Sequence, residues 1–415
     1  MNISKLNHRK RDKIMTKLFA MKKEMVIYFI ILALTALGLG LSNDIFSNYF
    51  KDAYNITAYQ RGIIEFPREL PGILCIFVVT ALSFMGDIRL SIIAQVLSFI
   101  GIAVLGFITP TFSVMLIFLF INSMGMHLFF PLQDSIGISL IDDEKIGKRM
   151  GQYKGVFTAF SMVAAIMVFV GFRTNVFSFT TKIKYIFVID AVIFLVIIVL
   201  FVYLLKLLKR PLVKKKKLKF VFRREYKYYY ILAIMHGVQK QIMVVYGPWV
   251  LIDILNKKAD TLAILMMIGS FIGIFFIPAV GRWLDRFGVK KLLYADALSF
   301  IGVYVAYGLI STGFATGKLS LVGLPVIFAY SLIIIDRMSM QMGMVKTVYL
   351  RSIAVDMSDI TPTLSMGISM DHVVSIVCAF IGGLIWSSWG PQYIFFFAAA
   401  LSLVNLFVAK KVQIK

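Results

Sequence analysis

The sequence predicts an all-α protein that crosses a membrane many times, and three observations carry this prediction. Sixty per cent of the 415 residues are hydrophobic and only 16% are charged, whereas soluble domains are about 45–50% apolar with about a quarter charged. The apolar residues form runs of roughly 20, the length that a helix needs to cross a bilayer. Basic residues collect between these runs. The composition therefore argues against water-soluble domains and against a disordered chain.

Twelve apolar runs are long enough to form transmembrane helices. Those in the first half cover residues 24–46, 57–84, 89–109, 112–139, 151–172 and 183–207. Those in the second half cover residues 228–251, 261–283, 289–312, 319–343, 364–387 and 390–409. We therefore expect two pseudo-symmetric six-helix bundles, an arrangement that is typical of secondary transporters built from internal repeats.

A strongly basic segment separates the two sets of six runs. Residues 206–227 contain eleven Lys and Arg and one Glu. The predicted organisation is a basic N-terminal segment, a first bundle, a basic linker, a second bundle and a short tail. These parts correspond to residues 1–23, 24–207, 208–227, 228–409 and 410–415.

The distribution of basic residues predicts the orientation of the chain. With a cytoplasmic N-terminus, the inner segments hold 33 Lys and Arg, the outer loops hold seven, and four lie within the apolar runs. Basic residues favour the cytoplasmic side, so both termini are expected inside, in the cytoplasmic membrane of a bacterium. The net charge of +23 is mostly this orientation signal, aided by attraction to anionic lipid. No recognition fold for nucleic acid accompanies it, so no nucleic-acid partner is expected.

The sequence contains no pattern typical of an enzyme or of a bound cofactor. Cys75 and Cys378 lie in separate apolar runs, which gives neither a disulfide framework nor a metal-binding spacing. There is no phosphate-binding loop, no H-E-x-x-H motif and no nucleophile elbow. We therefore expect a protein without a cofactor or resident metal that is not an enzyme and that draws its energy from an ion gradient.

One motif lies at the inner end of the eighth run, and it reads Gly281-Arg282-Trp283-Leu284-Asp285-Arg286-Phe287-Gly288-Val289-Lys290-Lys291. It resembles the G-x-x-x-D-R-x-G-x-K/R-K/R signature between paired helices of the major facilitator superfamily. The resemblance implies that fold, and it implies a cytoplasmic gate formed by the motif residues. These are Gly281, Asp285, Arg286, Gly288, Lys290 and Lys291.

The first half contains a reduced counterpart of this motif. The segment Ser83-Phe84-Met85-Gly86-Asp87-Ile88-Arg89-Leu90 keeps an acid and a base, Asp87 and Arg89, but lacks the flanking glycines and the double-basic end. We expect Asp87 and Arg89 to belong to the same gate. The fifth run lacks the glycine–proline cluster of drug–proton antiporters in this family, and the fourth lacks their intramembrane arginine.

The second run carries charges that lipid exposure cannot explain. Arg61, Glu65, Arg68 and Glu69 lie on one helical face about 100° wide. A charge at mid-bilayer costs about 2.5–3.5 kcal/mol, so these side chains should face an internal cavity and pair with each other. We expect Glu65, Arg68 and Glu69 to handle substrate or protons. The alternative is a structural network of ion pairs between helices.

Further polar residues occur at membrane depth in four other runs. Lys240 is the most informative, because a buried lysine suits a substrate carboxylate or phosphate; it can equally be the counter-ion of Glu65 or Glu69. The remaining candidates for the cavity are His127, His236, Asp336, Arg337, Asp371 and His372.

Both signs of charge in these runs favour a polar or ionic substrate. The leading hypothesis is a secondary transporter of a polar small molecule that works by alternating access, coupled to protons or to Na⁺, as a monomer in the lipid bilayer. The alternatives are a multidrug/proton antiporter, a transporter of a metal such as copper or iron, and a transport-dead sensor or scaffold. Methionines near His372 would suit Cu(I), although flexible packing explains them as well.

Overall fold

The computed structural model describes residues 23–140, 146–208, 222–356 and 359–412, and within these ranges the chain forms helices and no strand. This confirms the predicted all-helical class. The helices of the first half are α2 (Lys23–Ser42), α3 (Phe46–Tyr54), α4 (Ala58–Ala81), α5 (Asp87–Phe107), α6 (Phe112–Ser139), α7 (Ile146–Arg173) and α8 (Tyr185–Leu207). Those of the second half are α9 (Lys227–Trp249), α10 (Ala259–Ala315), α11 (Leu324–Gln341), α12 (Met344–Ile353), α13 (Ile360–Ser388) and α14 (Pro391–Lys411).

The observed helices follow the predicted apolar runs closely. α6 has the bounds of the run at 112–139, and α4 lies within the run at 57–84. The run at 319–343 differs, because α11 ends at Gln341 and α12 begins at Met344. The chain turns at Met342 and Gly343, where backbone hydrogen bonds run from Met342 N to Ser339 O and from Gly343 N to Met340 O.

Nine segments of the described chain are long and apolar enough to cross a membrane. One of them is α10, which is 57 residues long and contains a non-helical residue, Gly288, with φ 79° and ψ 162°. The backbone kinks at this residue, so α10 consists of two helices that follow each other end to end. α4, with four charged residues, and α9 are not among the nine.

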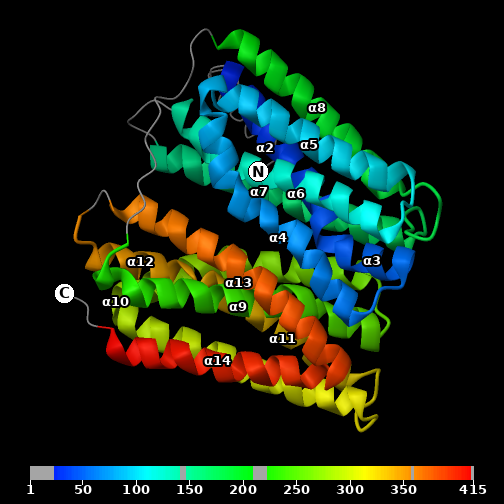
Figure 1. Ribbon diagram of the computed structural model, residues 1–415, viewed down its shortest axis with the longest axis vertical. Coiled ribbons are helices and arrows are strands. Elements are labelled where there is room, and N and C mark those ends of the chain that lie inside the picture. The colour runs from blue at the N-terminus through cyan, green and yellow to red at the C-terminus, as the bar shows by residue number, and fades with distance from the viewer. Residues whose placement is uncertain (1–22, 141–145, 209–221, 357–358, 413–415) are drawn as a thin grey trace, which may run out of the picture.

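Each half packs mainly on itself. In the first half α5 packs on α6 and α8, and α2 on α7 and α8; in the second half α10 packs on α11 and α14, and α9 on α13. Figure 1 shows α2–α8 in the upper part of the view and α9–α14 below. The two halves meet where α4 packs against α13 and where α7 packs against α10.

Glycine makes the α4–α13 contact possible. A Cβ atom on Gly62 would lie 2.4 Å from the carbonyl oxygen of Ala379 on α13. Small residues let transmembrane helices approach closely, so that van der Waals contact drives their association. Gly62 lies one residue from Arg61, and the close crossing therefore brings the charged face of α4 against the second half.

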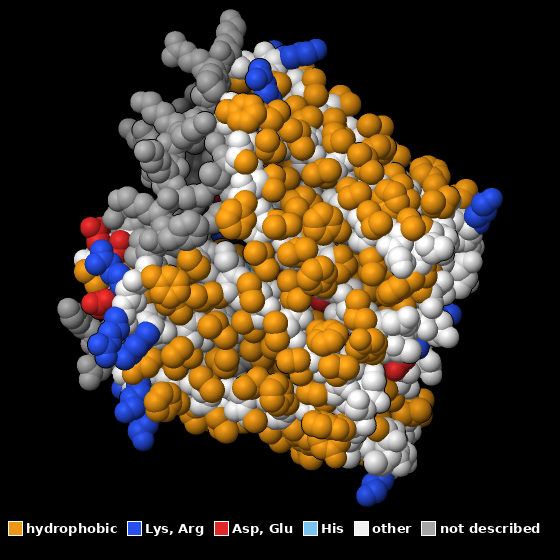
Figure 2. All heavy atoms as spheres, viewed as in Figure 1, with side chains coloured by type: hydrophobic (Ala, Val, Ile, Leu, Met, Phe, Trp, Pro, Cys, Tyr) orange, Lys and Arg blue, Asp and Glu red, His pale blue; other side chains and the backbone are white. Residues whose placement is uncertain are grey.

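The outer surface is apolar, with charges at its two ends. Figure 2 shows hydrophobic side chains over most of one face and lysine and arginine near its margins. Large side chains such as Phe77, Phe275 and Val199 are at least 60% exposed. A soluble monomer rarely exposes so large an apolar surface, whereas lipid covers it in a membrane protein.

We name the two ends of the helix bundle after the segments that lie there. The α3 end holds α3 and the loops at 174–184 and 316–323. The linker end holds the start of α2, the end of α14, the end of α8 and the start of α9.

Candidate substrate and proton site

Glu65 is the centre of a buried network on α4. It forms an ion pair with Arg61, one turn earlier, and its Oε1 also accepts a hydrogen bond from Arg68 Nη1 at 2.6 Å. Its Oε2 accepts from Gln241 Nε2 of α9 at 2.9 Å. Arg61 and Glu65 are each 1% exposed. Three donors therefore hold this carboxylate, and one of them belongs to the other half of the molecule.

Arg61 is anchored further by the α3 end. Its Nη2 donates to Ser47 Oγ at 3.2 Å, and its guanidinium lies 5.8 Å from the ring centroid of Phe50. Buried charges persist only where they are paired and hydrogen-bonded. The Arg61–Glu65–Arg68 group meets this condition, and its two cations and one anion leave one surplus positive charge.

Glu69 contacts the second half directly. Its Oε2 lies 2.7 Å from Nδ1 of His372 on α13, and both side chains remain partly exposed, at 15% and 13%. A Cβ atom on Gly72 would lie 2.5 Å from the His372 ring, so only glycine admits the ring at this position. Glu69 and His372 thus form a polar contact between the halves.

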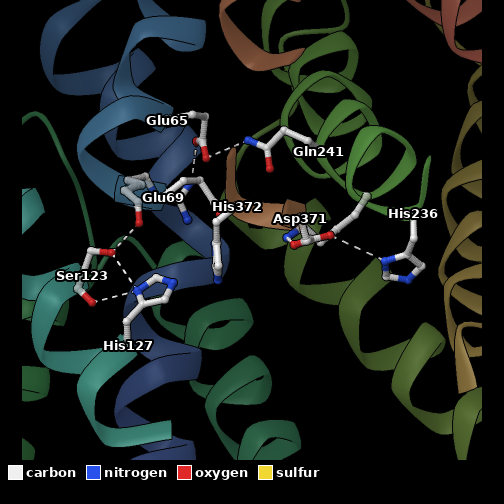
Figure 3. A network of polar contacts seen from close by, with 10 residues as sticks. Glu65, Glu69, Ser123, His127, His236, Gln241, Asp371 and His372 are labelled. Carbon is white, nitrogen blue, oxygen red and sulfur yellow. Dashed lines mark hydrogen bonds and ion pairs between the residues drawn. The ribbon is translucent and has the colours of Figure 1, made fainter. Parts of the chain in front are cut away.

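His127 of α6 packs against the His372 ring in an edge-to-face arrangement. Its ring centroid lies 5.0 Å from that of His372, with the planes at 71°. Its Nδ1 is 2.9 Å from the carbonyl oxygen of Ser123, and Ser123 Oγ donates to the carbonyl oxygen of Arg68 at 2.5 Å. Because a carbonyl only accepts, Nδ1 of His127 is the donor in its contact with Ser123. Figure 3 shows the two rings between Ser123 and Asp371.

A second group lies on the C-terminal half. Lys240 of α9 forms an ion pair with Asp371 of α13, and His236 Nδ1 lies 3.7 Å from Asp371 Oδ1. A Cβ atom on Gly237 would lie 2.9 Å from Asp371 Oδ1, so glycine again permits the approach. Figure 3 shows Asp371 between His372 and His236. The predicted residues of α4, α6, α9 and α13 therefore form one polar cluster between the halves.

Three members of this cluster were missed in the sequence. Gln241 follows Lys240 directly, but it lies 176 positions from Glu65 in the sequence, and nothing in the sequence indicated that the two side chains meet. Lys346 of α12 lies within electrostatic range of Asp371, Lys240 and Asp296; it was counted among the basic residues of an inner segment because the apolar run ends at 343. Asp296 stands inside the apolar run at 289–312, and this position alone could have identified it.

Asp336 and Arg337 lie apart from the cluster, on α11. Asp336 is 4% exposed and lies near Tyr304 of α10. The Arg337 side chain runs along α10, where it contacts Met266 and where a Cβ atom on Gly269 would lie 3.1 Å from its Cδ. These two residues line the packing of α10 against α11.

The two loops that carry the motif share one backbone feature. Gly288 has φ 79° and ψ 162°, and Gly86 has φ 79° and ψ 156°, a conformation that is essentially confined to glycine. This aligns Gly86 with Gly288, so that Asp87 corresponds to Val289. Asp285 precedes its glycine by three residues, whereas Asp87 directly follows Gly86, so the two carboxylates occupy different positions in their loops.

The side chains of this motif lie around the linker end. Asp87 accepts a hydrogen bond from Ser135 Oγ of α6 at 2.6 Å, and Lys290 donates to the carbonyl oxygen of Lys410 at 3.3 Å. The guanidinium of Arg286 lies 5.2 Å from the ring of Phe287. Each of these contacts stays within one half. The other motif residues named in the sequence are exposed or half-buried: Arg89, Gly281, Asp285 and Lys291.

At the α3 end, by contrast, polar contacts join the halves. Lys51 of α3 forms an ion pair with Asp253 at 2.5 Å, and Asn48 Nδ2 donates to the carbonyl oxygen of Lys257 at 3.3 Å. Arg173, at the end of α7, lies 3.9 Å from Asp260. The halves are thus held together at the α3 end and at the central cluster.

Within the described ranges, no group of three or more His, Cys, Asp or Glu side chains is arranged to hold a metal ion. Cys75 and Cys378 are free and half-buried. Cys75 Sγ donates to the carbonyl oxygen of His127 at 3.0 Å, so this cysteine supports the position of α6 against α4.

Comparison with solved structures shows transporters of one fold. A variant of the nucleoside transporter NupG has a TM-score of 0.76 and 14% identity, over 94% of this chain and 99% of that one. A D-xylose-proton symporter has a TM-score of 0.69 and 15% identity, over 94% and 98%. A POT family transporter in complex with 5-aminolevulinic acid has a TM-score of 0.72 and 12% identity, over 93% and 96%. At these identities the likeness establishes the fold.

A comparison of sequences identifies the family. No curated protein is a significant match to this sequence. Residues 28–362, however, match the sequence profile of the Major Facilitator Superfamily. The apolar outer surface and the long helices agree with a protein that spans a membrane many times. The chain belongs to the Major Facilitator Superfamily.

Proposed function

We propose that this protein is a secondary active transporter that moves a polar or ionic small molecule by alternating access, coupled to protons. The observation that carries the proposal is the contact between Glu69 and His372, 2.7 Å long and formed by one residue from each half. A transporter needs its ion-binding group where the halves meet, because the ion must change the relative stability of the two conformations.

A proton suits this position for a physical reason. When the Glu69–His372 pair takes up one more proton, the contact between a carboxylate and a neutral imidazole becomes an ion pair between a carboxylate and an imidazolium, in which opposite charges attract each other. Loss of that proton weakens the link between α4 and α13. Glu65 is less suited to exchange protons, since Arg61, Arg68 and Gln241 hold it at 1% exposure.

We further propose twelve transmembrane helices with both termini in the cytoplasm of a bacterium. The nine long apolar segments become ten when α10 is divided at Gly288, and α4 and α9 complete the set. α4 and α9 are less apolar than the other spans because each carries charged and polar residues of the cluster. The linker end would then be cytoplasmic, in keeping with its basic residues.

The contacts at the α3 end fit a conformation that is closed to the outside. Lys51–Asp253 and Asn48–Lys257 link the halves there, while the hydrogen bonds described for Asp87 and Lys290 at the linker end each stay within one half. The opposite conformation would break the contacts at the α3 end and close the motif loops across the halves.

A reconstituted system tests the proposal. The purified full-length protein is placed in proteoliposomes with an imposed pH gradient and a defined mixture of metabolites, drugs and metal ions, and solute accumulation is measured by mass spectrometry. We expect at least one polar organic solute to accumulate only when the gradient is present. Accumulation of a hydrophobic cationic drug would support the multidrug antiporter instead, and accumulation of a metal would support the metal transporter. No accumulation of any solute would support a transport-dead protein.

A disulfide cross-link at the α3 end tests whether transport requires the two halves to separate there. A disulfide between Lys51→Cys and Asp253→Cys, in a background of Cys75→Ser and Cys378→Ser, should hold the halves together there. Transport should stop under oxidation and return under reduction. Transport that continues with the cross-link formed would contradict alternating access.

A further inference from the structure

The polar cluster contains positively charged donors that the contacts described above leave unused. Lys240 is 26% exposed and Arg68 is 18% exposed. A lysine ammonium has three donors and a guanidinium five, and the contacts described above use one donor of Lys240 and one nitrogen of Arg68. Lys346 has no hydrogen bond or ion pair with any residue in the described ranges. These side chains are suited to bind an anion.

Before the additional proton binds, the positive and negative charges of the cluster sum to zero. The Arg61–Glu65–Arg68 group has one surplus positive charge, Lys240 cancels Asp371, and Lys346 opposes Asp296. If the three histidines of the cluster are counted as neutral and its carboxylates as ionised, Glu69 supplies the remaining negative charge. The cluster is then neutral overall. One additional proton on Glu69 or His372 gives it a charge of one positive unit.

A net charge in a site of low dielectric is costly unless a counter-charge enters with it. A monovalent anion supplies that counter-charge, and it would find the ammonium groups of Lys240 and Lys346 on α9 and α12. Zwitterions and neutral molecules do not restore the balance. Proton binding and anion binding would therefore each favour the other.

We propose that the protein is a symporter of a small monovalent anion with one proton, bound by Lys240 and Lys346 while the proton resides on Glu69 and His372. This inference rests on the proposed function and adds the substrate class and the stoichiometry. It makes transport electroneutral, since one negative and one positive charge cross together. An electroneutral symporter responds to the pH gradient and is insensitive to the membrane potential.

The test uses full-length protein in proteoliposomes with potassium and valinomycin to set the membrane potential. The solutes are lactate, pyruvate and benzoate, inorganic phosphate at a pH where it is mainly monovalent, alanine, uridine, xylose and choline, all present together. We expect a carboxylate or phosphate to accumulate on the alkaline side by about tenfold per pH unit, because one pH unit is about 1.4 kcal/mol for each proton. Which solute accumulates shows whether the transported anion is a carboxylate or a phosphate.

Other outcomes separate this inference from the proposed function. Accumulation of alanine, uridine, xylose or choline, accumulation on the acidic side, or a rate that follows the membrane potential would overturn the anion symporter while leaving a transporter. If no solute accumulates under either gradient, both proposals fail.

Lys346 provides a variant with a matched control. Lys346→Gln should raise the half-saturating concentration of the accumulated anion by at least about tenfold, as expected for the loss of a charged hydrogen bond, and Lys346→Arg should retain transport. Lys318→Gln, in an exposed loop at the α3 end, should behave as the parent. Thermal unfolding of each variant shows whether it folds. A folded Lys346→Gln with unchanged half-saturation would refute the assignment of Lys346.

Discussion

Replacing Glu65 with Gln should destabilise the protein more than the same change at Glu69, four residues along the same helix. Glu65→Gln keeps the size of the side chain but leaves Arg61, at 1% exposure, and Arg68 without their shared counter-charge. Removal of one partner from a buried ion pair costs about 3–5 kcal/mol. Because the Gln side chain still accepts one hydrogen bond, worth about 1 kcal/mol, the lower end of this range, about 3 kcal/mol, applies.

Glu69→Gln should cost much less. Glu69 and His372 are 15% and 13% exposed, and the Gln amide can still hydrogen-bond to a neutral imidazole. The loss should therefore be about 1 kcal/mol, the size of one hydrogen bond or of a partly exposed pair. The difference between the two variants, about 2 kcal/mol, is close to a thirtyfold difference in the unfolding equilibrium.

Equilibrium unfolding in mixed micelles of dodecyl maltoside and dodecyl sulfate measures both free energies on the same footing, with tryptophan fluorescence as the signal. A double-mutant cycle of Glu65→Gln with Arg61→Met isolates the pair. Equal destabilisation by the two single changes, or a loss below about 1 kcal/mol for Glu65→Gln, would refute the view that Glu65 is the buried structural centre of the cluster.

Three further changes test other parts of the molecule. Asp253→Asn removes the partner of Lys51, and partly exposed ion pairs of this kind are worth about 0.2–1 kcal/mol. The fraction of molecules open at the α3 end should therefore rise by up to about fivefold, as measured by distances between spin labels on the two halves. An unchanged fraction would show that this ion pair is not part of the gate. Gly62→Ala places a Cβ atom against α13 and should lower the free energy of unfolding by about 1–3 kcal/mol. Gly155 has open space around it, so Gly155→Ala should leave the free energy of unfolding unchanged or raise it. Equal effects of the two changes would contradict the close crossing of α4 and α13. Gly288→Ala forces alanine into a conformation that costs about 1–3 kcal/mol, and a melting temperature equal to that of the parent would show that the loop does not need this glycine.

The sequence was sufficient to predict most of the helices, because a membrane-spanning helix needs about 20 mostly apolar residues. The run at 112–139 became α6 without a shift. The motif at Gly281 likewise indicated the family. Failures occurred where polar residues end or interrupt a helix. α12 carries Lys346 beyond the end of its apolar run, and this residue was therefore counted as an inner-loop charge.

The cluster could be predicted only in part. Insertion cost explains why Glu65, Glu69, Lys240 and Asp371 should face inward, and they do. The choice of partners was beyond the sequence, since Glu69 and His372 are 303 positions apart and the contact depends on the path of α13 past α4. Asp336 and Arg337 are adjacent in the sequence, and this gave no indication that the Arg337 side chain runs along α10.

Glu69→Gln tests most directly whether a proton on Glu69 and His372 couples the pH gradient to transport. In proteoliposomes, the variant should still exchange the accumulated solute across the membrane when it is present on both sides, since the halves can still move. It should lose the accumulation that the pH gradient drives, which in the parent is about tenfold per pH unit. Exchange retained with accumulation lost is the result that this account predicts. A folded Glu69→Gln variant that still accumulates the solute against its gradient would contradict it.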